Sequence, residues 1–298
     1  MTPSAHLDTD SSLTTRTDMP YTRQVDRDHP SLIVVLLDES YSMSESLAGD
    51  PTRTKAQAVT DILNGLLYEL VLRCVKNPHE GPRSYFAVAV VAYRSNGSGG
   101  AIVESAFSAP LNAADVAWIP DIAANPRRVE TRPAPSGSGQ VHSPVWIESK
   151  ASGGTPICSA LDRAGRLVSG WLQHYGSSFP PIVLNLTDGE STDGDPTPWS
   201  QRLRQLESDD GPTLLFNLHL SSDSAAPVLF PARPVATDDE FSSLLFDMSS
   251  SLPPFMVEAA RAQGVPVEQG ARGFGFNADL RSIMTFLNVG TSVGKVLR

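Results

Sequence analysis

Four short runs of large apolar residues predict buried β-strands. They are rich in Val, Leu, Ile and Phe and cover Leu32 to Leu37, Tyr85 to Tyr93, Ile182 to Leu186 and Leu214 to Leu220. Because the runs are continuous and do not alternate strictly with polar residues, we expect both faces of each strand to be covered. Strands of this kind are typical of parallel sheets in α/β proteins.

Apolar residues at three- and four-residue spacing predict helices between these strands. One stripe runs from Val59 to Cys74, and a second begins at Thr155-Pro156 and ends at Leu172. This alternation predicts an α/β fold with a doubly wound, mostly parallel central sheet and helices on both faces. A turn at Ser95 to Gly100 makes Ala101 to Phe107 one antiparallel edge strand. Two further helical segments are Glu240 to Gln263, broken at Pro253-Pro254, and Asn277 to Leu287, capped by Asn277.

The remaining segments predict one domain between two tails. Residues 1–30 contain few large apolar side chains and predict a mobile tail, and residues 291–298 form a second tail. Between them we expect a single domain over residues 31–290. Its stretch 120–152 is rich in Pro, Gly and Ser and is expected to be a long loop insertion with a little strand character.

Composition narrows the classes of partner. The chain has 298 residues, a hydrophobic content of 40% and a formal net charge of -10. Without a stripe of Lys and Arg, this acidic balance argues against a nucleic acid or an anionic membrane as partner. No run approaches the roughly 20 apolar residues that cross a bilayer, and the N-terminal segment lacks a signal-peptide pattern. Cys74 and Cys158 lie in apolar helical patterns, so we expect buried reduced thiols and a cytoplasmic protein.

Hydroxyl and carboxylate side chains gather where the predicted strands end. Asp38, Ser40 and Ser42 form the pattern Asp-x-Ser-x-Ser after the first strand. Asp188 follows the third strand, and Gly153-Gly154-Thr155-Pro156 opens the helix before it. In open parallel sheets, ligands bind outside the carboxyl ends of the strands, so the three loops should converge. Their hard oxygen atoms suit a divalent cation, which neutral hydroxyls would leave electrophilic.

In this order and on these elements, the three segments resemble the metal-ion-dependent adhesion site of von Willebrand factor type A domains. The resemblance covers about Ser31 to Leu287 and implies a Rossmann-like fold with a Mg2+ site, which Mn2+ or Ca2+ could also occupy. The site residues that it implies are Ser40 and Ser42 as hydroxyl ligands, Thr155 as a direct or water-mediated ligand, and Asp38 and Asp188 acting largely through bound water. An Asp or Glu of a protein partner would fill the last coordination position. Tyr41 departs from the pattern, because the family often has Gly there.

A looser resemblance concerns the C-terminal part of the chain. Phe274 to Leu280 and the helix that follows are similar to von Willebrand proteins encoded with tellurium-resistance and related stress systems. This resemblance implies a protein that acts with a serine/threonine kinase or a metal-dependent phosphatase in stress response or phage defence. The lack of a signal-peptide pattern and of a bridging Cys pair favours the intracellular bacterial type of the family. The expected function is therefore Mg2+-dependent protein binding, without enzymatic activity.

Each site residue also has a simpler interpretation. Ser40 and Ser42 could be turn residues, Thr155 a helix cap, and Asp188-Gly189 a common turn. The enzymatic alternative is a Mg2+-dependent phosphohydrolase of the haloacid-dehalogenase type, but this class needs a second acid where the chain has Ser40. A serine hydrolase would need Gly where the chain has Asp193.

Overall fold

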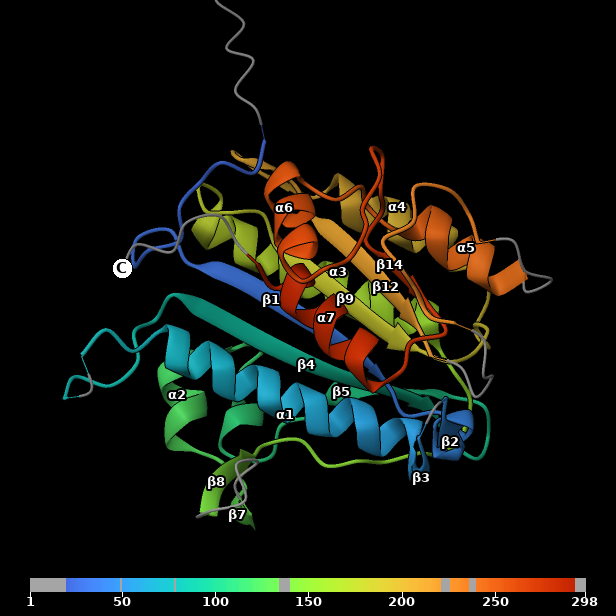
Figure 1. Cartoon of the computed structure of the whole chain (residues 1–298), viewed down its shortest axis with the longest axis horizontal. Helices are drawn as coiled ribbons and strands as arrows, with labels where there is room; N and C mark the ends of the chain where they lie inside the picture. Colours follow the sequence, from blue (N-terminus) through green and yellow to red (C-terminus); the bar gives the residue numbers. More distant parts are fainter. Residues whose placement is uncertain are drawn as a thin grey trace, which may run out of the picture.

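The computed structural model describes residues 20–48, 50–77, 79–133, 140–220, 226–235 and 240–292. An eight-stranded sheet forms the centre of this part of the chain (Figure 1). From one edge to the other its strands are β13 (Val228–Leu229), β14 (Phe274–Phe276), β12 (Leu214–His219), β9 (Ile182–Thr187), β1 (Ser31–Asp38), β4 (Phe86–Ser95) and β5 (Ala101–Ser105), and β6 (Ala117–Trp118) also pairs with β4. All four predicted buried strands are confirmed.

The pairing of the strands makes the sheet mostly parallel. β1 lies parallel to β4 and β9, β9 to β12, and β12 to β14. The predicted edge strand β5 is antiparallel to β4, as expected. The sequence did not predict two short antiparallel additions, β6 on β4 and β13 on β14. The doubly wound α/β class is therefore confirmed, with antiparallel strands at both edges.

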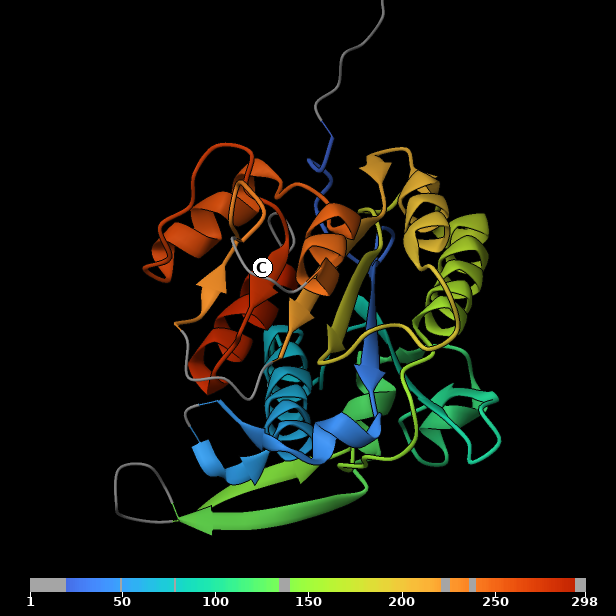
Figure 2. The ribbon, with the colours of Figure 1, turned by 90° about the vertical axis from the view of Figure 1, so that its right-hand side faces the viewer.

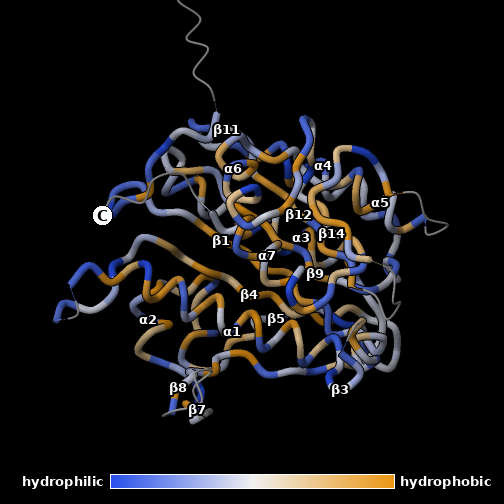
Figure 3. Tube along the Cα trace, in the orientation of Figure 1, coloured by the Kyte–Doolittle hydropathy of each residue, from blue (hydrophilic) through white to orange (hydrophobic). Residues whose placement is uncertain are grey.

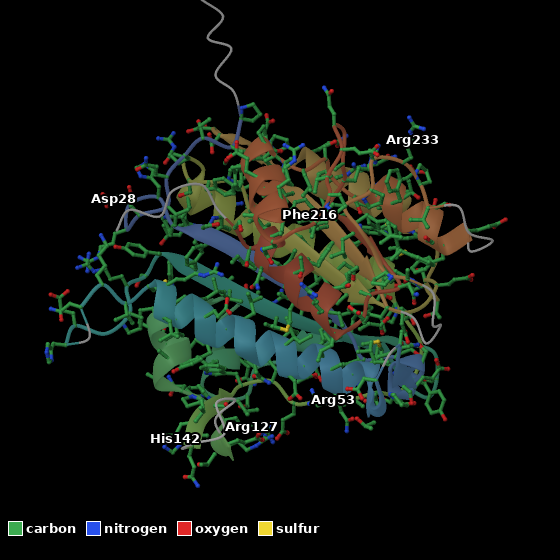
Figure 4. All side chains as sticks on the ribbon, in the orientation of Figure 1. Asp28, Arg53, Arg127, His142, Phe216 and Arg233 are labelled. Atoms are coloured by element: carbon green, nitrogen blue, oxygen red, sulfur yellow. The ribbon has the colours of Figure 1, made fainter. Side chains whose placement is uncertain are left out.

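Helices cover both faces of this sheet (Figure 2). One face carries α1 (Lys55–Arg73), α2 (Ile119–Ala124), α6 (Pro254–Ala262) and α7 (Leu280–Gly290), and the other α3 (Ile157–Tyr175), α4 (Thr197–Gln205) and α5 (Glu240–Met248). Successive side chains of β1 point to opposite faces, so Ile33 packs in the first layer and Leu32 in the second. Apolar positions accordingly gather at the centre of the fold in Figure 3. Figure 4 shows Phe216 in this interior and Arg53 at the periphery.

The segment 120–152 has more regular structure than expected. Besides α2 it contains the hairpin of β7 (Arg128–Pro133) and β8 (Gln140–Val145), whereas residues 134–139 lie outside the described part. Asn64 of α1 anchors the chain just after the hairpin. Its side-chain oxygen accepts hydrogen bonds from Trp146 N at 2.8 Å and Ile147 N at 3.0 Å, and its amide donates to Ile147 O at 2.9 Å. The expected loop therefore contains a largely exposed hairpin, and one buried amide anchors the chain that follows it.

The two ends of the predicted domain also differ from expectation. Residues 20–30 of the expected tail pack on the domain, since Val25 is buried and Asp210 accepts bonds from Thr22 N and Arg23 N at 3.0 and 2.9 Å. The rest of that tail and residues 293–298 lie outside the described residues. The last helix begins later than predicted. Its cap is Asp279, which accepts from Ser282 N at 2.8 Å, and the prediction of Asn277 as cap is wrong.

The remaining described elements are short. They are the 3-10 helices η1 (Tyr41–Ser44) and η2 (Leu111–Ala113) and the strands β2 (Ser46–Leu47), β3 (Asp50–Thr54), β10 (Glu207–Ser208) and β11 (Gly211–Pro212). Cys74 and Cys158 are free and buried, as expected. Burial raises the pKa of the two thiols to about 12 and about 11, which keeps them protonated. Within the described residues, no helix combines the length and apolarity that a membrane crossing requires.

Candidate metal site

The site lies where the connections of the sheet change direction. β1 has β4 as its neighbour on one side and β9 on the other, and the chain visits these two strands in turn. Asp38 is the last residue of β1, and Asp188 directly follows β9. Ligand crevices of open α/β sheets form at such a switch point, outside the carboxyl ends of the strands. Strand order therefore brings the two predicted carboxylates to one place.

Ser40, Ser42 and Asp188 form a compact group of oxygen atoms at this point. Ser42 Oγ donates to Asp188 Oδ1 at 2.6 Å, and the two serine hydroxyls lie 3.0 Å apart. Ser40 Oγ is 3.5 Å from the same carboxylate oxygen. The η1 turn holds both serines in place, because Met43 N donates to Ser40 O at 3.1 Å and the Met43 side chain is buried. Three of the five predicted residues thus contact one another.

Asp38 lies beneath this group and supports it. Its side chain accepts hydrogen bonds from Ser40 N and Thr187 Oγ1, both at 2.7 Å. Burial raises the pKa of Asp38 to about 7, and the nearby charge of Asp188 acts in the same direction, whereas the bonds from Thr187 and Ser40 favour the carboxylate. Asp38 therefore fixes the turn that carries Ser40. Both of its oxygens are used inside the protein.

Thr155 completes the group from a third loop. A Cβ atom on Gly189 would lie 3.4 Å from Thr155 Oγ1 and 3.7 Å from Ser42 Oγ, so both hydroxyls lie beside this glycine. The loop itself is anchored by the bond from Tyr41 N to Gly153 O at 2.9 Å. The structure thus brings all three predicted loops together.

The simpler interpretation of Thr155 as a helix cap is wrong. No side-chain cap bond comes from the N-cap position of α3, which is Pro156. Instead Asp193, from the loop after β9, accepts bonds from Cys158 N and Ser159 N, each at 2.9 Å. Although burial opposes ionisation, the bonds from Ser159 and Cys158 help to hold the pKa of Asp193 below its usual value. Sequence reasoning missed this cap, because the capping residue lies far along the chain from the helix it caps.

Lys55 is a second functional candidate that sequence reasoning missed. A capping box between Thr54 and Gln57 starts α1 and so places Lys55 at the first helical position. Its ammonium donates to Asp188 Oδ2 at 2.9 Å and to Glu45 Oε2 at 3.0 Å. Its side chain is only 4% exposed, and that of Asp188 is fully buried. A buried cation therefore sits against the far oxygen of the site carboxylate.

Two neighbours of the serines point away from the group. Glu39 pairs with Arg94 at 2.6 Å, and Arg94 also bonds Glu104 at 2.8 Å. Burial raises the pKa of Glu39, whereas the charges of Lys150 and Arg94 oppose this shift. Tyr41 is 72% exposed beside the site. Its ring is therefore accessible to any molecule that approaches the serines.

The donor set suits a hard divalent cation. Two carboxylates and three hydroxyls provide oxygen ligands alone, and Mg2+ is usually held by one or two carboxylates with waters remaining. Among the described residues, no three or more His, Cys, Asp or Glu side chains form a metal-binding group. The predicted set does not need one, since only Asp38 and Asp188 of its members belong to these residue types. The carboxylate of Asp188 already pairs with one cation, the ammonium of Lys55.

Comparison with known proteins shows no family for this chain. No protein-family model and no curated protein matches the sequence. Solved structures to which the chain shows some similarity include two of proximal thread matrix protein 1 from the mussel byssus, at 16% and 15% sequence identity and TM-scores of 0.45 and 0.46. Both alignments cover 90% of this chain but only 48% and 47% of the mussel protein, so the chain spans about half its length.

Proposed function

We propose that the chain is a von Willebrand factor A-type module that holds Mg2+ and binds an acidic side chain of a protein partner. The observation that carries this proposal is the contact of Ser40 and Ser42 with Asp188 across two loops, with Thr155 beside them on a third. Three hydroxyls bring no charge to a bound ion, so the ion keeps most of its attraction for a further anionic ligand. A carboxylate from another protein is such a ligand.

The same contacts argue against the phosphohydrolase alternative. In that class the first Asp attacks phosphorus and needs a free oxygen, with a second acid two residues later. Both oxygens of Asp38 accept internal hydrogen bonds, and Asp38 is only 1% exposed. Ser40 occupies the place of the second acid. We therefore propose a binding module without catalytic activity.

The cellular setting of this proposal comes from the sequence resemblance. The segment Phe274 to Leu280, which is similar to proteins of tellurium-resistance and stress systems, forms β14 and leads into α7. We place the module in the bacterial cytoplasm, in a stress-response or phage-defence complex with a serine/threonine kinase or a metal-dependent phosphatase. The two buried free thiols suit a reducing compartment.

Ion binding can be tested on the purified chain by titration calorimetry with Mg2+ and Mn2+. Ser42→Ala removes a hydroxyl that bonds Asp188 and should weaken ion binding by about tenfold or more, the effect of losing one good ligand interaction. Ser44→Ala is the matched control, since Ser44 is exposed at the end of the same η1 turn and should not affect affinity. Equal affinities of the two variants would contradict the proposed site.

Thr155→Ala separates ion binding from folding. Because Asp193 caps α3, the variant should keep the melting temperature of the wild type and still lose ion affinity. Partner binding follows the same logic: proteins recovered with the wild type in Mg2+ should be lost in EDTA and with Thr155→Ala. Mg2+-dependent hydrolysis of phosphate esters that Asp38→Asn abolishes would favour the phosphohydrolase instead.

A further inference from the structure

Lys55 carries its positive charge in a doubly unfavourable place. It is the first residue of α1, where the helix dipole is positive, and its side chain is 4% exposed. A buried charge is kept only when it is paired. Glu45 and Asp188 provide the pairing, but the Glu45 side chain is 58% exposed, so water screens it more than Asp188. The buried pairing of Lys55 is therefore chiefly with Asp188.

The two oxygens of Asp188 have different partners. Oδ2 accepts from Lys55, whereas Oδ1 accepts from Ser42 and lies 3.5 Å from Ser40 Oγ. A cation held by the serine hydroxyls would share the Asp188 carboxylate with the ammonium of Lys55. Two cations on one buried carboxylate repel each other strongly, because buried surroundings screen charges less than bulk water does.

We propose that Lys55 is a built-in cation that weakens ion binding by this site until an acidic partner arrives. The inference rests on the proposed function. We count only the buried charges of the site and leave out Glu45, whose exposed carboxylate is screened by water. At its most negative, with Asp38 and Asp188 both ionised, this buried group together with Lys55 carries one net negative charge. A divalent ion changes this to one positive charge, and a single partner carboxylate restores neutrality. Ion and partner therefore bind better together than either binds alone.

The test is the affinity of the whole purified chain for Mn2+, measured by titration calorimetry without any partner. Lys55→Met removes the charge and keeps a side chain of similar length for the buried space. We expect it to tighten Mn2+ binding by about tenfold or more. Lys76→Met is the matched control: Lys76 is exposed beyond the end of α1, so the net charge changes equally while the site affinity should not.

Two further substitutions keep the test decisive if Lys55→Met does not fold. The amide of Lys55→Gln is uncharged and can donate to Asp188, so this variant should also tighten binding, whereas Lys55→Arg keeps the charge and the weak affinity. Tighter binding by the uncharged variants, or binding by them alone, supports the inference. Unchanged or weaker binding, with Ser42→Ala still weaker than wild type, overturns it and leaves the proposed function standing. Binding by neither the wild type nor any variant overturns both.

Discussion

Asp193→Ala should destabilise the protein by removing the cap of α3. The carboxylate accepts four hydrogen bonds: from Cys158 N and Ser159 N at 2.9 Å, from Ser159 Oγ at 2.7 Å and from Ser191 Oγ at 3.0 Å. The two amide bonds satisfy donors that the first turn of a helix otherwise leaves without partners. The negative charge also lies at the positive end of the helix dipole.

The size of the effect follows from these contacts. Loss of an N-cap costs about 0.5 to 2 kcal/mol, and the interaction of the charge with the helix dipole adds about 0.3 to 1 kcal/mol. Asp193 is exposed, so water replaces part of what the substitution removes. We therefore expect a loss of about 1.5 kcal/mol in the free energy of unfolding, or about 3 °C in melting temperature for a chain of this size.

Urea unfolding followed by circular dichroism measures this loss. Glu190→Ala is the control, because Glu190 is exposed in the same loop and its removal changes the net charge equally. The folded-state pKa of Asp193 is lowered, so its contribution is fully present above the unfolded pKa of about 3.9 and disappears as pH falls through the lower folded value. The difference between wild type and Asp193→Ala should therefore shrink at pH 3.

Two results would refute this reasoning about the loop after β9. The first is an Asp193→Ala variant no less stable at neutral pH than Glu190→Ala, which would mean that water caps α3 equally well. The second is a larger loss of stability for Thr155→Ala than for Asp193→Ala. That order would restore Thr155 as the cap and weaken the argument that its hydroxyl serves the ion.

Two further substitutions test how the structure around the site is held. Asn64→Leu should lower the free energy of unfolding by about 3 kcal/mol in urea unfolding, because it leaves the buried amides of Trp146 and Ile147 without their acceptor; an unchanged stability would show that the β7–β8 hairpin does not depend on Asn64. Gly153→Ala should lower the free energy of unfolding by about 2 kcal/mol or more, because Gly153 has φ +73° and an added Cβ would clash with the backbone oxygen of Ser95. Loss of Mn2+ affinity in calorimetry should accompany it, and a wild-type affinity would show that the Thr155 loop can shift without harm to the site.

The sequence predicted the fold where apolar pattern and structure coincide. Continuous apolar runs predicted β1, β4, β9 and β12, because strands buried on both faces consist mostly of apolar residues. The sequence did not predict the helix α4, because its residues are mostly polar and only Leu203 and Ser200 of this helix are buried. The sequence also did not predict the β7–β8 hairpin within residues 120–152. The chain directly after it is anchored by Asn64, which lies in another element.

The sequence predicted the oxygen ligands of the site but not the buried positive charge of Lys55 beside them. Asp38, Ser40 and Ser42 are close in sequence, and parallel strands bring Asp188 to the same edge, so spacing and topology were sufficient. Lys55 carries no comparable pattern, because a lysine at the start of a helix is normally solvated. Its burial follows from the positions of η1 and of the loop after β9. Glu45 directly follows η1 and Asp188 directly follows β9, and both carboxylates accept hydrogen bonds from Lys55. Pairing across separate loops is visible only in three dimensions.

A buried row of polar side chains helps to fix the register on which the site depends. Tyr93 OH donates to Asn185 Oδ1 at 2.9 Å, Asn185 donates to Asn217 Oδ1 at 3.1 Å, and Asn217 donates to Ser249 Oγ at 3.0 Å. Asn185 and Asn217 lie directly opposite each other in β9 and β12. A slip of one residue would turn an amide to the other face and leave its partner unsatisfied, at a cost of about 1 to 3 kcal/mol for each buried group. Asp188 follows β9 directly, so the register of β9 also determines where Asp188 lies relative to Ser40 and Ser42. The buried polar row therefore disfavours strand registers in which the oxygen atoms of the site would lie apart.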